Sequence, residues 1–266
     1  MINDSPALGL ERVKDHLTGM GAKALTLYKG PCFERRLASR LRIHGINSVD
    51  QYADLLDRDP AERAKLLSAL AIGVTSFFRN PSAWLALGGL LKRPGHRVTG
   101  WSAGCSTGEE AYSLAMLLAG LHQTGSIGPW SVLGTDVDER CLTVARQGDY
   151  PGRSITELDP PGNAIVRDLE STATGVRFGR GLRDRVEFRR DDLTASVIQA
   201  RFDVVICRNV LIYFGNEGQA KVMDTLLGAI EPNGLLMLGK AEMAAAGPDQ
   251  RLQLVDRAER IYRRIG

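Results

Sequence analysis

The sequence predicts an α/β fold: a doubly wound, mostly parallel sheet in the larger part of the chain, preceded by an all-helical region. From Val98 onward, short apolar segments typical of strands alternate with longer amphipathic segments typical of helices, which is the pattern of a doubly wound sheet. Residues 1–72 instead carry helix signals and little strand signal. The apolar segments 252–255 and 260–263 are separated by a polar turn, and they predict a C-terminal antiparallel hairpin.

Composition argues against several classes of protein. Lys and Arg total 34 and Asp and Glu total 31 in 266 residues, so the net charge of +3 provides no broad basic surface for a nucleic acid. The four cysteines show no metal-ligand spacing and are expected to be reduced thiols. No apolar run approaches about 18 residues, and no secretory signal pattern opens the chain. We therefore expect a cytoplasmic protein that is not inserted in a membrane.

The most informative stretch, residues 98–118, has the pattern of a short strand, a turn of small residues and an amphipathic helix. Small residues in such a turn, among them Gly104, let a ligand approach the backbone closely. The turn lacks the glycine spacing of a dinucleotide loop and the Gly-Lys-Ser/Thr of a phosphate loop, so a pyrophosphate ligand is disfavoured. The helix has one apolar face for packing on a sheet, formed by Ala111, Leu114, Ala115, Leu118 and Leu121.

Two glutamates, Glu109 and Glu110, begin this helix, and two interpretations of them are open. Ser106 with Glu109 and Thr107 with Glu110 each have the spacing of a capping box, in which a hydroxyl and a carboxylate satisfy free amides at a helix start. Alternatively, the carboxylates bind a ligand that carries hydroxyls or a cation. Phosphate oxygens are less suitable there because they would meet negative charge.

Polar residues follow three further predicted strands at the point where each strand ends. The strand 130–135 leads into Asp136, and an acidic residue at this place in nucleoside-binding α/β folds receives ribose hydroxyls. Nearby Asp138 has a simpler explanation as the cap of a helix over 139–146. Carboxyl ends of parallel strands meet at one edge of the sheet, where ligands bind. The strand 186–189 leads into Asp191-Asp192-Leu193, and the strand 202–207 ends at Arg208-Asn209-Val210, where Asn209 either faces a ligand or caps the next segment.

In the N-terminal region, Phe33, Leu37 and Leu41 recur every four residues and predict a helix with one core-facing stripe. Four arginines flank this stripe, and they form either a solvated helix face or a docking surface for an acidic partner. Further helices are predicted around residues 50–56, after Ser48 as a cap, and over residues 60–71. The four arginines are Arg35, Arg36, Arg40 and Arg42.

Three other segments have distinct patterns. Residues 72–81 form an ordered loop in this interpretation, and its Arg79 either recognises a carboxylate or is an exposed arginine beside core aromatics. Residues 150–185 are rich in Pro and Gly and predict an inserted, β-containing excursion. A helix over 219–230 is expected to end at Pro232-Asn233-Gly234, before a strand over 235–238.

Taken together, several motifs resemble one family, the CheR family of S-adenosylmethionine-dependent protein-glutamate O-methyltransferases that act on chemotaxis receptors. The resemblance covers nearly the whole chain, and the order and spacing of the motifs make it specific. The motifs are Tyr28-Lys29, Arg35-Arg36-Leu37, Thr75-Ser-Phe-Phe-Arg79, Trp101-Ser-Ala-Gly-Cys-Ser-Thr-Gly-Glu-Glu110, Thr135-Asp-Val-Asp138 and Cys207-Arg-Asn-Val-Leu-Ile-Tyr-Phe214.

The resemblance implies a helical receptor-docking domain over residues 1–80 and a class I methyltransferase domain over residues 81–266, with a small β-subdomain inserted at about 150–185. It implies S-adenosylmethionine as cofactor, S-adenosylhomocysteine as product and no metal. It also implies roles for individual residues, with Glu110 preferred to Glu109 for the cofactor. The cofactor-binding set is Gly73, Thr75, Arg79, Gly104, Glu109, Glu110, Asp136, Asp192, Leu193, Asn209 and Val210.

The implied chemistry needs no general base, because a glutamate side chain is already ionised near neutral pH and its carboxylate attacks the sulfonium methyl directly. Placement of the two reactants and exclusion of water are what the protein supplies, with Arg79 and Tyr213 as the expected catalytic residues. The chain departs from the family pattern at Gly73, where the family commonly has Asn, at Asp192, often Asn, and at Lys240-Ala241, often His-Ser.

The expected partner is the cytoplasmic helical domain of chemoreceptors, bound through the four arginines, so that the protein is recruited to membrane receptor arrays. Reversing Arg36 and Arg40 to Glu is predicted to raise the KM for receptor without changing cofactor affinity. Two alternatives are methylation of another protein or of RNA, and a catalytically weak, cofactor-sensing docking module. The near-neutral charge argues against RNA.

Overall fold

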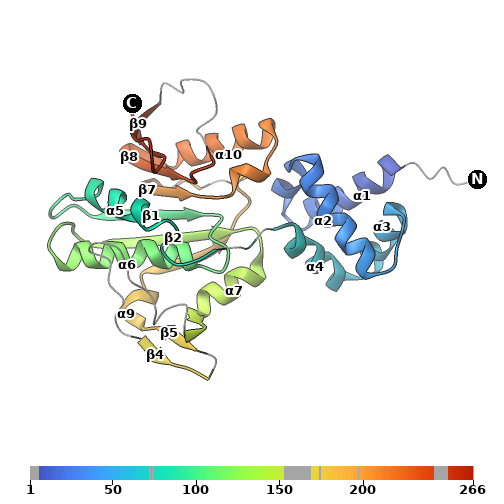
Figure 1. Cartoon of the computed structure of the whole chain (residues 1–266), viewed down its shortest axis with the longest axis horizontal. Helices are drawn as coiled ribbons and strands as arrows, with labels where there is room; N and C mark the ends of the chain where they lie inside the picture. Colours follow the sequence, from blue (N-terminus) through green and yellow to red (C-terminus); the bar gives the residue numbers. More distant parts are fainter. Residues whose placement is uncertain are drawn as a thin grey trace, which may run out of the picture.

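The chain folds into a helical domain and a larger sheet domain that lie side by side (Figure 1). The computed structural model describes residues 6–71, 73, 75–152, 169–173, 175–196, 198–242 and 251–265. Each domain has its own buried apolar core, and the sheet domain has one on each face of its main sheet. The predicted combination of a helical N-terminal domain with a doubly wound sheet is confirmed.

The helical domain packs its helices around a core that includes the predicted stripe of Phe33, Leu37 and Leu41, all of which are buried. Asp59 caps the last of these helices by accepting hydrogen bonds from the Ala61 and Glu62 amides. Ser48 precedes its helix as predicted, but its side chain makes no capping hydrogen bond. The elements are α1 (Pro6–Gly19), the 3-10 helix η1 (Lys23–Leu27), α2 (Gly30–Ile43), α3 (Val49–Arg58) and α4 (Pro60–Leu70).

The main sheet has seven strands in the order β6-β2-β1-β7-β8-β10-β9. β6, β2, β1, β7 and β8 run parallel, whereas β10 pairs antiparallel with β8 and β9. The predicted C-terminal hairpin therefore forms the edge of this sheet. The strands are β1 (Val98–Ala103), β2 (Trp130–Asp136), β6 (Val186–Arg190), β7 (Phe202–Cys207), β8 (Ile230–Leu238), β9 (Leu252–Asp256) and β10 (Ile261–Arg264).

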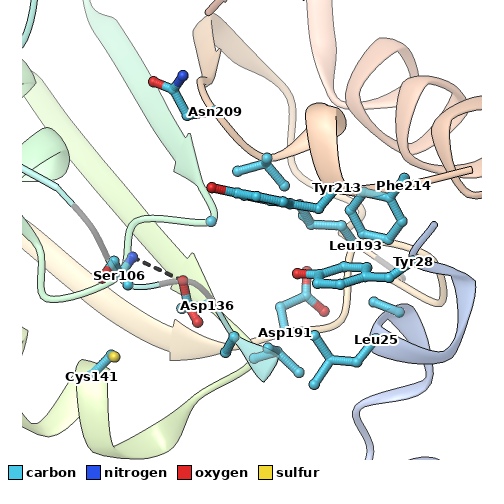
Figure 2. Close-up of a pocket in the computed structure, with 16 residues that line it drawn as sticks. Leu25, Tyr28, Ser106, Asp136, Cys141, Asp191, Leu193, Asn209, Tyr213 and Phe214 are labelled. Carbon is cyan, nitrogen blue, oxygen red and sulfur yellow. Dashed lines mark hydrogen bonds between the residues drawn. The ribbon is translucent and has the colours of Figure 1, made fainter. Parts of the chain in front are cut away.

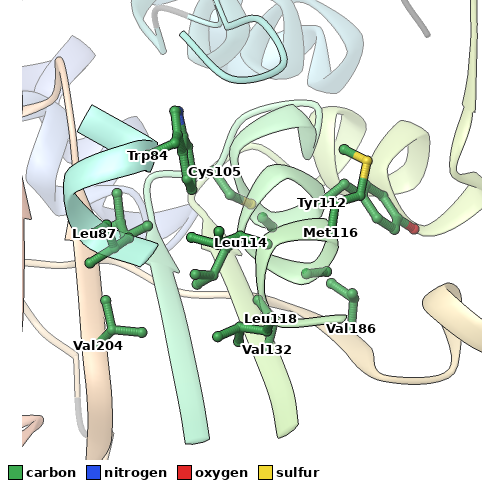
Figure 3. Close-up of a cluster of buried hydrophobic side chains, with 14 of the residues drawn as sticks. Trp84, Leu87, Cys105, Tyr112, Leu114, Met116, Leu118, Val132, Val186 and Val204 are labelled. Atoms are coloured by element: carbon green, nitrogen blue, oxygen red, sulfur yellow. The ribbon is translucent and has the colours of Figure 1, made fainter. Parts of the chain in front are cut away.

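Helices cover both faces of the sheet. On one face, α5 (Pro81–Leu90), α6 (Glu109–Gln123) and α7 (Glu139–Gln147) pack on strand residues such as Val204, and Figure 3 shows part of this core. On the other face, α10 (Asn216–Gly228) packs on the intervening strand residues, such as Val205. The predicted apolar face of α6 is buried, and so are Tyr112, Ser113, Met116, Leu117 and Gly120 outside that face. A Cβ at Gly100 would lie 2.5 Å from the Leu114 side chain, so the glycine permits this close packing of α6 on β1.

The inserted segment contains β structure, as predicted: its described residues contribute a small three-stranded sheet of order β3-β5-β4, followed by α9 (Arg180–Arg183). Its strands are β3 (Asp149–Tyr150), β4 (Leu169–Ser171) and β5 (Val176–Phe178), and residues 153–168 of the prediction lie outside the described part. Phe178 is buried against Tyr112 of α6, with ring centroids 4.6 Å apart. The small sheet is therefore anchored on the helix that begins at the predicted ligand turn.

The prediction for residues 219–238 was wrong in its boundaries. α10 begins at Asn216 and ends at Gly228, and β8 already begins at Ile230. The Pro232-Asn233-Gly234 breaker lies within β8, where pairing with β7 shifts in register between Phe202 and Val204. This irregularity absorbs a proline and the left-handed Asn233, with φ of 64°, without ending the strand.

A buried charge cluster joins α2 to α4. The Glu62 carboxylate, which has no solvent exposure, accepts hydrogen bonds from Arg40 (2.6 Å) and Tyr52 (2.6 Å) and lies 3.0 Å from His44 Nε2. Burial alone would raise the pKa of Glu62, but these hydrogen bonds outweigh it and lower the pKa to about 2. A carboxylate whose folded-state pKa is lowered stabilises the fold above its unfolded pKa. That contribution is lost as pH falls from the ordinary value of 4.5 toward 2.

We predict that Arg40→Ala lowers the free energy of unfolding by about 3 to 5 kcal/mol at pH 7, because Glu62 is left as an unpaired buried charge. Urea denaturation measures this, with Arg35→Ala, an exposed arginine on the same helix, as a control expected to change stability by less than about 0.5 kcal/mol. The difference between Arg40→Ala and the natural protein should shrink below pH 4. Equal effects of the two substitutions would contradict the assigned role of the cluster.

Candidate active site

Two cavities open at the carboxyl edge of the parallel strands. The space in the larger, counted together with the solvent at its opening, is about 600 Å³, and that in the smaller is about 410 Å³. They share four lining residues, Gly104, Ser106, Asn209 and Val210, which follow β1 and β7. A Cβ at Gly104, where φ is +76°, would lie 2.7 Å from Val210, so the absence of a side chain keeps the two loops in contact. This is the edge at which the sequence placed a ligand.

The larger cavity lies between the two domains (Figure 2). Tyr28 of the helical domain stacks on Tyr213 with ring centroids 5.8 Å apart and meets Phe214 edge to face. Burial raises the pKa of the Tyr28 hydroxyl well above its usual range, so the ring remains neutral. The remaining lining from residues before the sheet domain is Ala24, Leu25, Ala71 and the predicted Gly73, and the remaining sheet-domain lining includes Asp136, Val137, Cys141, Asp191 and Leu193.

Asp136, at the end of β2, faces the larger cavity as predicted. Its two carboxylate oxygens accept the backbone N–H groups of Ser106 (2.8 Å) and Asp138 (3.0 Å). Burial raises its pKa, and the two amide hydrogen bonds oppose this rise. Asp138 itself caps α7 by accepting from the Arg140 amide, as predicted, and also bonds Ser68 of α4. Asp136 is therefore held in one orientation toward the cavity.

The structure places Asp192 differently from the sequence prediction. Its carboxylate accepts the Ala24 amide (2.8 Å) and the amide and hydroxyl of Thr194. It thus fastens η1 to the loop after β6, and Asp191 and Leu193 line the cavity in its place. Asp191 could have been predicted as well as Asp192, because both follow the same strand. Only one of two adjacent side chains in such a loop is expected to face the cavity.

The smaller cavity is polar and charged. It is lined by Thr75, Arg79, Glu110 and Arg208 besides the shared residues and Ser76. Glu110 accepts a hydrogen bond from Ser102 (2.8 Å) and lies 4.0 Å from Arg208. Burial raises the pKa of Glu110 to about 7, although Arg208 opposes the rise. A carboxylate and two guanidinium groups therefore face one small space.

Neither of the two predicted capping boxes forms, because the Ser106 and Thr107 hydroxyls do not bond the amides of Glu109 and Glu110. The N-cap is Gly108, with φ of 99° and no side-chain cap, and a Cβ there would lie 2.8 Å from Ala145. Glu109 instead accepts a hydrogen bond from Thr107 (2.6 Å) and lines neither cavity. This arrangement agrees with the preference for Glu110 as the ligand-binding glutamate.

Two buried residues of the site were given no role from the sequence, although Arg208 stands at the polar end of a predicted strand. Arg208 is 6 % exposed and donates to the Asn80 side chain (2.7 Å). Glu242 is 3 % exposed, and its carboxylate accepts four backbone amides, those of Asn209, Val210, Ile212 and Gly239, at 2.7 to 3.3 Å. Glu242 thereby holds Asn209 in the left-handed region, with φ of 60°. Its only sequence signal was the Gly-Lys-Ala-Glu stretch after β8.

Family comparison agrees with this architecture. Residues 73–260 match the model of the CheR methyltransferase, SAM binding domain, and residues 10–71 match that of the CheR methyltransferase, all-alpha domain. The chain belongs to the CheR methyltransferase family. Its CheR relatives include Chemotaxis protein methyltransferase 2 of Pseudomonas aeruginosa, 32% identical over 87% of this chain and 85% of that protein. The Chemotaxis protein methyltransferase of Escherichia coli K12 is 32% identical over 78% of this chain and 74% of its own length.

The cavities of this CheR chain fit S-adenosylmethionine. The aromatic pair and Asp136 suit a nucleoside, and the charged small cavity suits an amino-acid group that carries both an ammonium and a carboxylate. The buried guanidinium of Arg208 also has two nitrogens, Nε and Nη1, without a hydrogen-bond partner among the described residues. In the part of the chain that the structure describes, no three His, Cys, Asp or Glu side chains gather to hold a metal ion. None of the described helices has the length and apolar composition needed to cross a bilayer.

The four arginines of α2 do not form one free surface. Arg40 is bound to Glu62, and Arg36 donates to the Ala69 carbonyl (2.7 Å), so both are tied to α4. Arg35 and Arg42 are exposed. The predicted reversal of Arg36 and Arg40 is therefore an unsuitable test of docking, because Arg40→Glu would place a second carboxylate against the buried Glu62.

We predict that Glu242→Gln lowers the free energy of unfolding by about 2 to 3 kcal/mol, because the new amide NH₂ group would face backbone N–H donors. Urea denaturation measures this loss. Glu187→Gln, at an exposed position on β6, is the matched control and should change stability by less than about 0.5 kcal/mol. A Glu242→Gln protein as stable as the control would show that the carboxylate does not organise the loop.

Proposed function

We propose that this chain transfers a methyl group from S-adenosylmethionine to glutamate side chains of chemoreceptors, giving glutamate methyl esters and S-adenosylhomocysteine. The strongest support is the juxtaposition of Glu110 with Arg79 and Arg208 in one small cavity beside the nucleoside-sized one. The names of its CheR relatives add support, since they are chemotaxis protein methyltransferases. We also propose a domain boundary near residue 80 and action in the cytoplasm at receptor arrays.

In this proposal, Asp136 accepts the ribose hydroxyls and the pair of Tyr28 and Tyr213 packs on the nucleoside. Glu110 binds the ammonium of the cofactor's amino-acid group, and Arg79 and Arg208 compensate the negative carboxylate charge in the smaller cavity. When bound, S-adenosylmethionine supplies an electrophilic sulfonium methyl. Near neutral pH the acceptor glutamate is ionised, so the protein has no proton to remove and contributes placement and exclusion of water. Arg79 orients the acceptor carboxylate, and Tyr213 lines its approach.

The decisive experiment incubates the protein with methyl-labelled S-adenosylmethionine and receptor-containing membranes, followed by mild base. Methyl esters release volatile methanol, which is the expected result. Membranes whose receptor carries Gln at the accepting glutamates are the matched control and should give no volatile label. Base-stable label, or label on added RNA, would indicate another acceptor. Cofactor binding without transfer would indicate a sensing module.

We predict that the affinity for S-adenosylhomocysteine falls about tenfold as pH is lowered from 7 to 5.5, since Glu110 with its pKa of about 7 becomes protonated and no longer attracts the ammonium. Titration calorimetry measures the affinity. Glu110→Gln should bind weakly with little pH dependence, whereas Glu109→Gln should retain the pH dependence of the natural protein. An unchanged pH dependence in Glu110→Gln would remove the assignment of the ammonium to this residue.

We predict that reversing the two exposed arginines, Arg35→Glu with Arg42→Glu, raises the KM for receptor membranes by about three- to tenfold, because charge steers association. The affinity for S-adenosylhomocysteine should not change. Reversal of exposed charges elsewhere in the helical domain, Arg58→Glu with Lys65→Glu, is the matched control and should leave the KM within about twofold. Equal KM values for both double variants would exclude α2 as the docking surface.

A further inference from the structure

Ser106 stands out among the residues that line the two cavities. It is 6 % exposed, and its hydroxyl has no hydrogen-bond partner among the described residues. Buried hydroxyl groups are nearly always hydrogen-bonded, because desolvation without a partner is unfavourable. Asp136 accepts the Ser106 amide, and Glu110 accepts the Ser102 hydroxyl. The remaining neighbour is the Cys141 thiol, which interacts with the Ser106 hydroxyl but is only a weak hydrogen-bonding group. The Ser106 hydroxyl therefore has no strong hydrogen-bond partner among the described residues and is available to a ligand.

The backbone of Ser106 adds a second observation. Its φ is +52°, in the left-handed region that residues other than glycine rarely adopt. Glycine would adopt this conformation without strain, and the same chain does place glycines at the left-handed positions 104 and 108. A serine is therefore kept here against the local conformational preference, which indicates a use for its side chain.

The position of Ser106 identifies the ligand group that it can reach. Ser106 lines both cavities, the larger together with Asp136 and the smaller together with Glu110. Figure 2 shows Ser106 beside Asp136. Gly73 lies against its hydroxyl, and even a Cβ there would come within 3.0 Å of the Ser106 oxygen. The absence of a side chain at Gly73 leaves room beside this oxygen. Because the amide of Ser106 binds Asp136, the hydroxyl and that carboxylate are held next to each other.

We propose that the Ser106 hydroxyl forms a hydrogen bond with a ribose hydroxyl of the bound cofactor, next to the one that Asp136 receives. This assignment rests on the proposed use of S-adenosylmethionine. A hydroxyl can both donate and accept, so it complements a carboxylate that only accepts, and a ribose diol presents one group to each. Ser106 is in this view a binding residue that discriminates ribose from deoxyribose ligands.

The test compares Ser106→Gly with Ser106→Ala by titration calorimetry against S-adenosylhomocysteine and methylthioadenosine, which lacks the amino-acid part. Both variants lose the hydroxyl, but only Gly also relaxes the left-handed backbone. Both should bind each ligand about three- to tenfold more weakly, as expected for one neutral hydrogen bond. Thermal unfolding should separate the variants, with Ala the less stable. The same titrations use 2′-deoxy and 3′-deoxy methylthioadenosine. One of these two ligands lacks the hydroxyl that Ser106 contacts, and its affinity should be the same for the natural protein and for both variants.

Each other outcome has a defined meaning. If the natural protein does not bind S-adenosylhomocysteine, the proposed function fails and the Ser106 assignment fails with it. If the natural protein binds and both variants bind equally well, only the Ser106 assignment is overturned, and a trapped water is then its partner. A loss confined to one variant indicates a backbone effect. A loss of affinity for S-adenosylhomocysteine but not for methylthioadenosine places the contact on the amino-acid part. This result, like a loss in one variant only, overturns the proposed ribose contact.

Discussion

The contact between the helical domain and the carboxyl edge of the sheet forms the larger cavity of the candidate site. Lys29 donates its amide to the Tyr213 carbonyl (2.8 Å), and Gly215 donates to the Leu27 carbonyl (3.0 Å). The Ala24 amide on Asp192 adds a third tie. These bonds fix η1 and Tyr28 over the strand ends, so that Tyr28 and Tyr213 stack across the domain boundary. The nucleoside-sized cavity exists because two separately packed cores meet at this edge.

Buried charges shape the other half of the site. In the protein interior a carboxylate needs partners, and the described residues provide them in two different ways. Glu242 is satisfied by four backbone amides and acts as a rigid support for the loop after β7. Glu110 has one hydroxyl and a guanidinium 4.0 Å away, so its charge remains available to a ligand. The contrast separates a carboxylate that is fully used by backbone amides from one that lines the smaller cavity.

Sequence reasoning predicted the fold well because its signals are local. Alternating strand and helix patterns, the stripe of Phe33, Leu37 and Leu41, and the hairpin all follow from periodicity. The boundary of β8 was missed because pairing with β7 overrides the breaker signal of Pro232, and that pairing is a long-range effect. Within the site, Asp136 was predicted from its place after a strand, whereas Glu110 was preferred to Glu109 only through the family resemblance, and both line a cavity.

The remaining site residues depended on tertiary contacts that no local pattern encodes. Asp191 and Asp192 are neighbours in sequence, and only the docking of η1 decides which of them accepts the hydrogen bond of the Ala24 amide. Likewise, a helical wheel places Arg40 beside the apolar stripe of α2 and Arg35 on the opposite side, but the partner of Arg40, the buried Glu62 of another helix, is a tertiary contact. Tyr28 was part of a family motif in the sequence, and only the fold shows that its ring lines the same cavity as Asp136.

The small inserted sheet has a mechanical consequence for the rest of the enzyme. Tyr150 of β3 packs its ring on Phe77, with centroids 5.0 Å apart, and donates its hydroxyl to the Thr107 carbonyl (2.7 Å). Thr107 belongs to the turn between β1 and α6, and Phe77 belongs to the loop that carries Thr75 and Arg79. A single aromatic side chain thus clamps both loops, so any displacement of the small sheet pulls on two walls of the catalytic pocket at once.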